Sequence, residues 1–455
     1  MSPDSPYWRC LPATRAAVLV DAADYYAAAR QAMAKARRSI RLLNWAFESR
    51  TRLNPSSDER IGDFLKARAA DGIDVRILVW KTALPIAATQ DWFPLQDRRS
   101  FAGSGVKFVL DGHHPFGACH HQKVLVVDDQ IAFCGGTDIG VDRWDSARHL
   151  DADPGRARPQ GGFHDARHEV MALVDGEPAA VLGEVFAERW RRATGETPPP
   201  PESAEVDVWP EGVAPDFTGA MVGVSRTAPA WRDWPEVRES ESLTFASIAA
   251  AQRSIYIENQ YLTSPAVAEA LARRLTEPDG PEVTLVSTSR APHWFDRMTM
   301  DRARGDFINR LRRADAGGRL RVLSPATAGG AAIVVHAKLA IFDDDFVRVG
   351  SSNMNNRSTG FDTECDLSFR LTSEADRAAA RALRQRLLEH WTGRLAPIEP
   401  RPLAPLARFI ASYHIGDPTG PADSFRLGLR RRRLETEVAA VAAGAHAVWD
   451  QPAPE

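Results

Sequence analysis

The sequence predicts an α/β fold made of two similar domains. Each is expected to hold a mixed, mostly parallel sheet flanked by helices, and a pseudo-two-fold axis is expected to relate them. Three observations support this prediction. First, the spacing His-x-Lys-x4-Asp occurs twice in the 455 residues, once in each half. Second, apolar runs with strand character alternate with amphipathic helical segments along both halves. Third, the proline-rich segment GETPPPPE at 195–202 fits neither a helix nor a central strand, and so separates the halves.

The first half begins with a predicted helix and continues with a strand. ARRSI at 36–40 precedes an apolar strand that ends near Trp45. Further strands are predicted at 74–79 and at 106–110, before the strand that carries the first motif. The half closes with a helix that ends at Trp190.

The second half repeats this order. AQRSI at 251–255 precedes a strand that ends near Tyr261. Strands predicted at 282–286 and 320–323 come before the second motif, and a closing helix ends at Trp391. A repeated order of elements indicates two copies of one structural unit.

These elements divide the chain into four segments. We expect a first repeat at 1–197, a linker at 198–212, a second repeat at 213–394 and an extension at 395–455. Two units of this size fall in the usual range for single domains. The extension carries an arginine run at 430–433, which is expected to be a solvated helix face rather than a binding site.

The two motifs supply the candidate site. They consist of His121, Lys123 and Asp128, and of His336, Lys338 and Asp343. Because side chains repeat with period two along a strand, the His and Lys of each copy share one face and can contact one ligand. A lone histidine on an apolar strand is usually a core residue. A lysine beside it in both copies instead indicates an anionic ligand, since an unpaired ammonium is costly to bury.

Composition narrows the class of protein. The chain has 57 basic and 60 acidic residues, for a net charge of −3, so it lacks the basicity expected of a general nucleic-acid binder. No run of about 18 apolar residues predicts a membrane span. The N-terminal residues show no secretory signal, and the four cysteines are scattered without metal or disulfide spacing. We therefore expect a cytoplasmic protein, with peripheral attachment to a membrane left open.

Longer stretches around the motifs add a more specific pattern. They are GGTDIGVDRWDSARHL at 135–150, FHDARHEV at 163–170, RSIYIENQYLTS at 253–264 and SSNMNNRSTGFDTE at 351–364. With the motifs, these stretches resemble the phospholipase D superfamily, and its two-repeat phospholipid-cleaving branch more closely than its one-repeat nucleases. The resemblance covers most of the chain. Phe163 stands where the family usually has Trp.

The resemblance implies roles for the two histidines. His121 would be the nucleophile that forms a phosphohistidine intermediate, and His336 the general acid and later the base that activates water. In the family a carboxylate downstream of each motif fixes the tautomer of a ring. Glu364 matches this residue after the second motif and Asp165 after the first.

The expected chemistry also needs cations at the phosphate. Lys123, Lys338 and Asn353 are expected to hold the nonbridging oxygens. The motif aspartates complete the set of candidate catalytic residues, although we expect them to orient backbone instead of touching substrate. In the first half the place of Asn353 is taken by Asp138, so the halves should bind phosphate unequally. No metal is needed for this chemistry and no HExxH or CxxC spacing occurs, so we expect no cofactor and no metal.

The function implied is a phospholipase D that cleaves glycerophospholipids to phosphatidate and a head-group alcohol, with transfer to other alcohols as a side activity. One chain carries both motifs, so a monomer would suffice. Aromatic residues in predicted loops could line the mouth of the site, namely Trp92, Phe93, Trp294 and Phe295. A cardiolipin-synthase-like phosphatidyl transferase is the closest alternative. A nuclease is less favoured, because the family's tyrosyl-DNA phosphodiesterases lack the motif aspartate. An inactive scaffold is disfavoured because every expected polar residue is present in both motifs.

Overall fold

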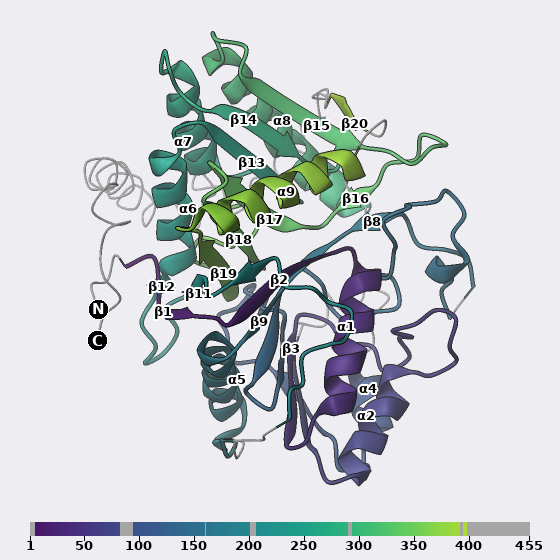
Figure 1. Ribbon diagram of the computed structural model, residues 1–455. Coiled ribbons are helices and arrows are strands. Elements are labelled where there is room, and N and C mark those ends of the chain that lie inside the picture. Colours follow the sequence, from purple (N-terminus) through teal and green to yellow (C-terminus); the bar gives the residue numbers. More distant parts are fainter. Residues whose placement is uncertain are drawn as a thin grey trace.

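Two sheets flanked by helices form the body of the protein in the computed structural model (Figure 1). The structure describes residues 5–81, 94–159, 161–200, 206–289, 294–391 and 395–397. The two sheets and their helices confirm the predicted α/β fold with helix-flanked mixed sheets. Trp92, Phe93 and the arginine run at 430–433 lie outside the described residues, and so do the side chains of Trp294 and Phe295.

The first sheet has eight strands. In spatial order they are β10 (Phe217–Thr218), β2 (Arg15–Val20), β9 (Val170–Asp175), β7 (Ile131–Gly135), β6 (Val124–Val127), β3 (Ser39–Asn44), β4 (Asp74–Trp80) and β5 (Lys107–Asp111). Its helices are α1 (Ala22–Lys35), α2 (Ile61–Ala70), α4 (Pro94–Ser100) and α5 (Glu177–Thr194), with a short 3-10 helix η1 at Pro154–Arg156.

The second sheet has ten strands. Their order is β1 (Arg9–Pro12), β11 (Met221–Ala228), β19 (Glu364–Arg370), β18 (Phe346–Gly350), β17 (Lys338–Phe342), β13 (Ser254–Asn259), β14 (Glu282–Val286), β15 (Leu320–Pro325) and β20 (Leu395–Pro397), while β12 (Val237–Arg238) pairs with β11. Its helices are α6 (Glu239–Ala250), α7 (Pro265–Thr276), α8 (Trp294–Ala314) and α9 (Glu374–His390).

The two sheets repeat one pattern of pairing. Strands β3, β4 and β5 are parallel, as are β13, β14 and β15, whereas β6 with β7 and β17 with β18 form antiparallel hairpins. The expectation of mostly parallel sheets is wrong, because most neighbouring pairs are antiparallel. Each motif strand ends in a tight hairpin, which forces its partner to run the opposite way. Further antiparallel pairs, such as β2 with β9 and β11 with β19, form between segments that are distant in sequence.

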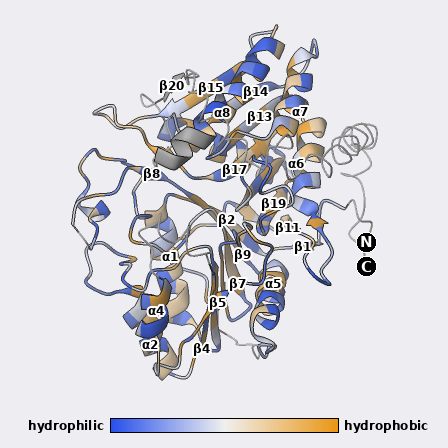
Figure 2. Cartoon of the chain, turned by 180° about the vertical axis from the view of Figure 1, so that it is seen from behind, coloured by the Kyte–Doolittle hydropathy of each residue, from blue (hydrophilic) through white to orange (hydrophobic). Residues whose placement is uncertain are grey.

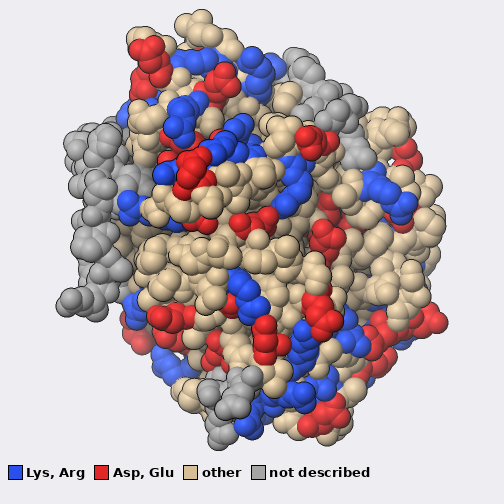
Figure 3. All heavy atoms as spheres, in the orientation of Figure 1, with Lys and Arg blue, Asp and Glu red and all other residues tan. Residues whose placement is uncertain are grey.

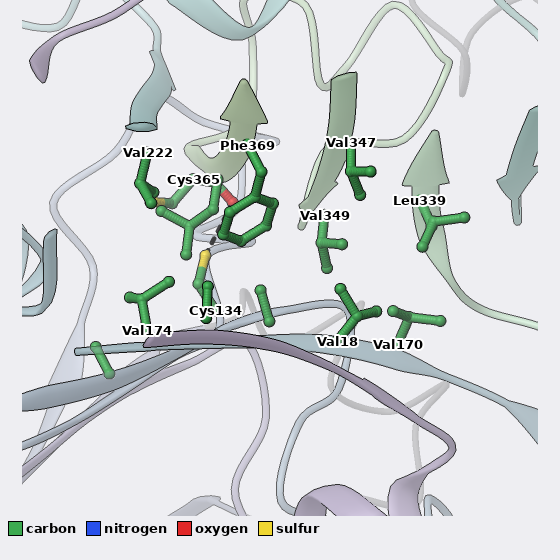
Figure 4. Packing of buried hydrophobic residues seen from close by; sticks show 14 of the residues in the cluster. Val18, Cys134, Val170, Val174, Val222, Leu339, Val347, Val349, Cys365 and Phe369 are labelled. Atoms are coloured by element: carbon green, nitrogen blue, oxygen red, sulfur yellow. Dashed lines mark hydrogen bonds between the residues drawn. The ribbon is translucent and has the colours of Figure 1, made fainter. Parts of the chain in front are cut away.

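The two units exchange strands and share a core. Strand β1, at the start of the chain, pairs with β11 of the second sheet, while β10 pairs with β2 of the first. Where the sheets face each other, apolar side chains from both fill the space, as Figure 4 shows. The residues labelled there are Val18, Cys134, Val170, Val174, Val222, Leu339, Val347, Val349, Cys365 and Phe369. Burial of this apolar area stabilises one arrangement of the two units. It therefore also positions the residues at the boundary between the units, which we call the seam.

Figures 2 and 3 show where hydrophobic and charged residues lie. In Figure 2 hydrophobic stretches run along the central strands, and on the face seen in Figure 3 basic and acidic side chains are interspersed. Among the described residues, none of the helices combines the length and the apolar character that a membrane crossing requires.

The motif aspartates lie at the hairpin tips, at the opposite end of each motif strand from its histidine. Asp128 accepts hydrogen bonds from the backbone N–H groups of Arg37, Arg38 and Ser39, at 2.7, 2.8 and 2.6 Å. Asp343 accepts the equivalent three bonds in the second unit. Both carboxylates therefore orient backbone within their own unit, which is the role expected of them from the sequence.

We expect Asp128→Ala to lower the free energy of unfolding by about 2–4 kcal/mol. Three backbone donors would lose a charged acceptor, and alanine would have to adopt the left-handed φ of 56° found at this position. A shift of the urea midpoint measures the loss. Asp63→Ala, at an exposed position on α2, is the control and should change stability by less than about 0.5 kcal/mol. Equal midpoints for the two variants would contradict this role.

Candidate active site

His121 stands just before β6 and its ring is held by the second unit. Its Nδ1 lies 3.0 Å from the carbonyl oxygen of Ser351 and 3.0 Å from Oε2 of Glu364. Both partners are acceptors, so Nδ1 must carry the proton in this arrangement. The neutral ring therefore keeps a lone pair on Nε2, as a nucleophile requires.

His336 is held in the same way by the first unit. Its Nδ1 lies 2.8 Å from Oε2 of Glu169, a residue with 0% of its surface exposed. Glu169 is fixed in turn by Nε of Arg167 at 2.8 Å and by the hydroxyl of Thr137 at 3.3 Å. Each ring thus receives its orienting carboxylate from the other unit.

Short backbone pairings bring these cross-unit contacts about. Thr363, which precedes Glu364, makes a parallel bridge to His120. His168, which precedes Glu169, pairs in parallel with Val335, which precedes His336; these lie in the two-stranded sheet of β8 (Arg167–His168) and β16 (Val334–Val335). The same geometry therefore occurs on both sides of the seam, and both histidines stand beside it.

Asp165 does not make the predicted contact. It is exposed, and Glu169 four residues later takes the place beside His336. A comparison of corresponding strands in the two halves would have identified Glu169 from the sequence. Glu364 begins β19, Glu169 directly precedes β9, and each of these strands leads into a closing helix. The prediction for Glu364 is confirmed by its contact with the His121 ring.

The two lysines are buried beside the rings. Lys123 Nζ donates to the carbonyl of His121 at 2.8 Å and lies 3.4 Å from Oδ2 of Asp138. Lys338 Nζ donates to the carbonyl of His336 at 2.6 Å and to Oε1 of Gln260 at 3.3 Å. Each ammonium thus has donor capacity left for an anionic ligand.

Asp138 and Asn353, which occupy corresponding places in the two halves, have different hydrogen-bond partners. Asp138 Oδ1 accepts from the backbone N–H groups of Trp45 and Ala46 and from the side chain of Asn44, at 2.9, 3.1 and 3.3 Å. Its counterpart Asn353 is buried, and within the described chain its Oδ1 has no hydrogen-bond partner. The asparagine side chain is therefore not committed to the protein in the way that Asp138 is.

The two motif histidines and the two motif lysines interact electrostatically. Burial, followed by the charges of Lys123 and Lys338, holds the pKa of His121 well below its usual value. Burial and the same two lysines, together with nearby arginines, hold the pKa of His336 well below its usual value. Each ring thus feels the ammonium of both units. The roles expected from the sequence require one neutral and one protonated ring, whereas these lowered pKa values favour the neutral form of both rings in the free protein.

Glycine permits the close packing behind the lysines. A Cβ on Gly135 would come within 2.5 Å of the carbonyl oxygen of Val170, and one on Gly350 within 1.8 Å of Asp366. A Cβ on Gly136 would meet the carbonyl oxygen of His336 at 3.0 Å. Gly135 and Gly350 thus allow close packing within their own units, and Gly136 allows the close approach of the second unit.

Comparisons with known proteins agree with this geometry. A family model described as "Phospholipase D" matches residues 32–212, and one described as "Cardiolipin synthase, PLD-like domain" matches residues 245–391. The chain is 25% identical to Phospholipase D A of Dictyostelium discoideum over 78% of this chain and 33% of that protein. It is 29% identical to Cardiolipin synthase A of Pseudomonas aeruginosa over 66% of this chain and 53% of that protein. The chain thus spans between a third and about half of the length of these curated relatives.

A solved structure supports the fold. The phosphatidylserine synthase of Haemophilus influenzae Rd KW20 superposes with a TM-score of 0.61, at 12% identity and over 97% of both chains. The duplicated motif, the carboxylates exchanged across the seam and the two family matches lead to one conclusion: the chain belongs to the phospholipase D superfamily.

Proposed function

We propose that the protein is a phospholipase D, which hydrolyses glycerophospholipids to phosphatidate and a head-group alcohol and can transfer the phosphatidyl group to other alcohols. One observation carries the proposal. The imidazoles of His121 and His336 each have Nδ1 held by a carboxylate of the other unit, which leaves both Nε2 atoms available beside two buried lysines. This arrangement suits in-line displacement at one phosphorus atom.

The proposed reaction has two displacements. Nε2 of His121 attacks phosphorus, the bond from phosphorus to the head-group oxygen breaks, and His336 gives its proton to that oxygen. Water then attacks the phosphohistidine, His336 takes the water's proton, and the bond from phosphorus to nitrogen breaks. Lys123, Lys338 and Asn353 hold the nonbridging oxygens throughout, where the transition-state charge lies.

The order of the two histidines gains support from their carboxylates. Burial raises the pKa of Glu364 well above its usual value, and the neighbouring Asp362 and Asp366 raise it further. A carboxyl with weakened negative charge does little to stabilise an imidazolium at His121, which suits a nucleophile. Glu169 is instead paired with Arg167 at 2.8 Å, as a carboxylate would be, which suits a ring that must hold a proton.

A lipid substrate is supported by the rim of the site. Phe116 is 92% exposed and lies in the segment that leads to His121, and Phe361 is 36% exposed and lies just before Glu364. The two segments touch, because a Cβ on Gly117 would be 3.7 Å from the ring of Phe361. Exposed aromatic rings beside a phosphate site suit contact with a membrane surface, so we propose peripheral attachment there.

Product analysis tests this function. The full chain is incubated with vesicles of phosphatidylcholine or phosphatidylglycerol, with and without ethanol, and separately with a single-stranded oligonucleotide. Phosphatidate, and phosphatidylethanol when ethanol is present, are the expected products. Cardiolipin and glycerol from phosphatidylglycerol would favour the transferase, which the description of the second family match makes the alternative. Oligonucleotide cleavage without lipid turnover would overturn the assignment.

We expect the pH optimum of kcat/KM to lie on the acidic side. This quantity reports the free protein, in which both histidine pKa values lie below 6.5. Turnover needs one neutral and one protonated ring, and the product of these fractions is largest between the two lowered values. The rate should therefore fall as the pH rises, because the acid loses its proton.

Once substrate is bound, the negative phosphodiester favours the imidazolium, so the optimum of kcat should lie at higher pH than that of kcat/KM. Initial rates with a soluble short-chain phospholipid from about pH 4 to 9 measure both quantities. An optimum of kcat/KM on the alkaline side of neutrality would contradict the two lowered pKa values.

A further inference from the structure

A second cluster of titratable side chains lies at the seam, and the proposed reaction does not use it. It consists of Asp21, His149, His168 and His390, whose potential ligand atoms all lie within 4.8 Å of one another. Asp21 precedes α1, His149 lies between β7 and η1, His168 ends β8 and His390 ends α9. Helix α1 begins and α9 ends close to the seam between the units (Figure 1). We call these four residues the seam cluster.

Three atoms of the seam cluster form a triangle of the size that a metal ion's ligands make. Nε2 of His149 and Nε2 of His390 are 3.0 Å apart, and Oδ2 of Asp21 lies 3.7 and 3.6 Å from them. Ligands at about 2.0–2.1 Å from a tetrahedral Zn²⁺ are roughly 3.3–3.4 Å apart. Small rotations that widen the distance between the two histidine nitrogens and shorten the two distances to Asp21 would therefore place the three atoms around one ion.

The surrounding groups hold these atoms in the orientation that a metal requires. Nδ1 of His149 donates to Oδ2 of Asp145 at 2.9 Å, which leaves the Nε2 lone pair facing the triangle. Nδ1 of His168 lies 2.8 Å from Oδ1 of Asp21, and its Nε2 lies 2.7 Å from Oε2 of Glu258. Both ring nitrogens of His168 are thus engaged by carboxylates, so His168 orients Asp21 and does not itself bind an ion.

Two further observations indicate a missing ligand. Oδ2 of Asp21 is buried and has no hydrogen-bond partner within the described chain, although the residue is only 1% exposed. In addition, Asp21 has φ 69° and ψ 153°, a region almost restricted to glycine, and His149 has φ 41°. Non-glycine residues are held in such conformations where the surroundings require their side chains, and functional sites are where this occurs most often.

We propose that Asp21, His149 and His390 bind one divalent transition-metal ion, with Zn²⁺ preferred, and leave the fourth position to a water molecule or small anion. Two imidazoles and one carboxylate are a typical zinc ligand set. Asp21 and His149 come from the first unit and His390 from the second, so the ion would join the units.

The proposed ion has a structural role and goes beyond the proposed function. His168, which orients Asp21, directly precedes Glu169, the carboxylate that holds the ring of His336. Trp391 packs against the same residues, with its ring stacked on His149 at 5.7 Å and edge-on to His168 at 4.6 Å. By fixing this corner, the ion would hold the cross-unit contact on which the second histidine depends.

The competing explanation is a hydrogen bond alone. His390 Nε2–H can donate to Nε2 of His149 at the observed 3.0 Å and close the cluster without an ion. The full chain is therefore stripped with dipicolinate, incubated with Zn²⁺ and passed over a desalting column, and bound zinc is measured by mass spectrometry. Thermal unfolding is followed on stripped and loaded protein.

We expect one Zn²⁺ per chain and a rise in Tm of a few degrees on loading. His390→Leu and Asp21→Asn should lose both effects. His113→Ala, a half-buried histidine that stacks on Trp234 outside the seam cluster, should keep both. Cobalt in place of zinc should give the strong visible absorption of a tetrahedral site in the wild-type chain only.

The proposal is overturned if the wild-type chain retains no more zinc than His390→Leu, or if zinc leaves its Tm unchanged. Neither readout depends on turnover, and the His336→Ala variant should bind zinc like the wild type. Failure of this proposal can therefore be told apart from failure of the proposed phospholipase activity.

Discussion

His121→Ala and His336→Ala should each nearly abolish phosphodiester cleavage while the protein stays folded. Loss of the nucleophile removes the covalent route, with an expected fall in kcat on the order of 10⁴–10⁶-fold. Loss of the general acid should lower kcat by about 10²–10⁴-fold with a natural head group, whose oxygen leaves poorly without a proton. Neither substitution should change Tm greatly, because both rings stand at the seam and not in the apolar core.

A change of leaving group separates the two roles. The p-nitrophenolate of bis-p-nitrophenyl phosphate leaves without a proton, so His336→Ala should release about one equivalent of it per chain in a rapid burst. Turnover should then be slow, because the base that activates water is also absent. Intact-protein mass spectrometry should find the phosphoryl adduct on this variant.

His121→Ala should show neither burst nor adduct. The control is His113→Ala, which lies outside the motifs and should retain wild-type rates. A burst from His121→Ala and none from His336→Ala would reverse the assignment of the two histidines. Normal turnover by either variant would remove the mechanism altogether.

The fold was predictable because the motif and the order of elements around it occur in both halves of the sequence. Each motif strand is apolar and ends in an Asp-Asp pair with positive φ, which produces the same hairpin in both units. The direction of most strands was harder to predict from the sequence. The three parallel strands at one side of each sheet were predictable from helix-strand alternation, but β2, β9, β11 and β19 pair antiparallel through contacts between distant segments.

The site was predictable to the extent that its residues are neighbours in sequence. His121 and Lys123 share one strand face, and so do His336 and Lys338, so period-two geometry sufficed. The orienting carboxylates come from the opposite unit, where only a tertiary contact decides which of several acidic residues reaches the ring. The seam cluster is a more extreme case, because its four members come from four separate segments and leave no spacing pattern.

Glu169→Gln is expected to be the most informative change outside the motifs, with a fall in kcat of about 10²–10⁴-fold. Glu169 is a positioning residue: it fixes the Nδ1–H tautomer of His336 and stabilises the charged ring, whereas a glutamine amide supplies no charge and can present a donor instead. Because the group acts through the imidazolium, the loss should be large with phosphatidylcholine and small in the burst phase with bis-p-nitrophenyl phosphate. The kcat profile should also lose activity at lower pH than the wild type, since the acid is less well held in its protonated form.

A purely structural role for Glu169 would lower both activities equally and leave the pH profile in place. Asp165→Asn provides the matched control, four residues away on an exposed position, and should keep kcat within about twofold of the wild type. If Asp165→Asn lost activity as Glu169→Gln is expected to, the carboxylate suggested by the family pattern would act in place of the one that contacts the ring. The two variants thus decide between sequence position and spatial contact, and the 2.8 Å separation of Glu169 Oε2 from His336 Nδ1 favours the contact.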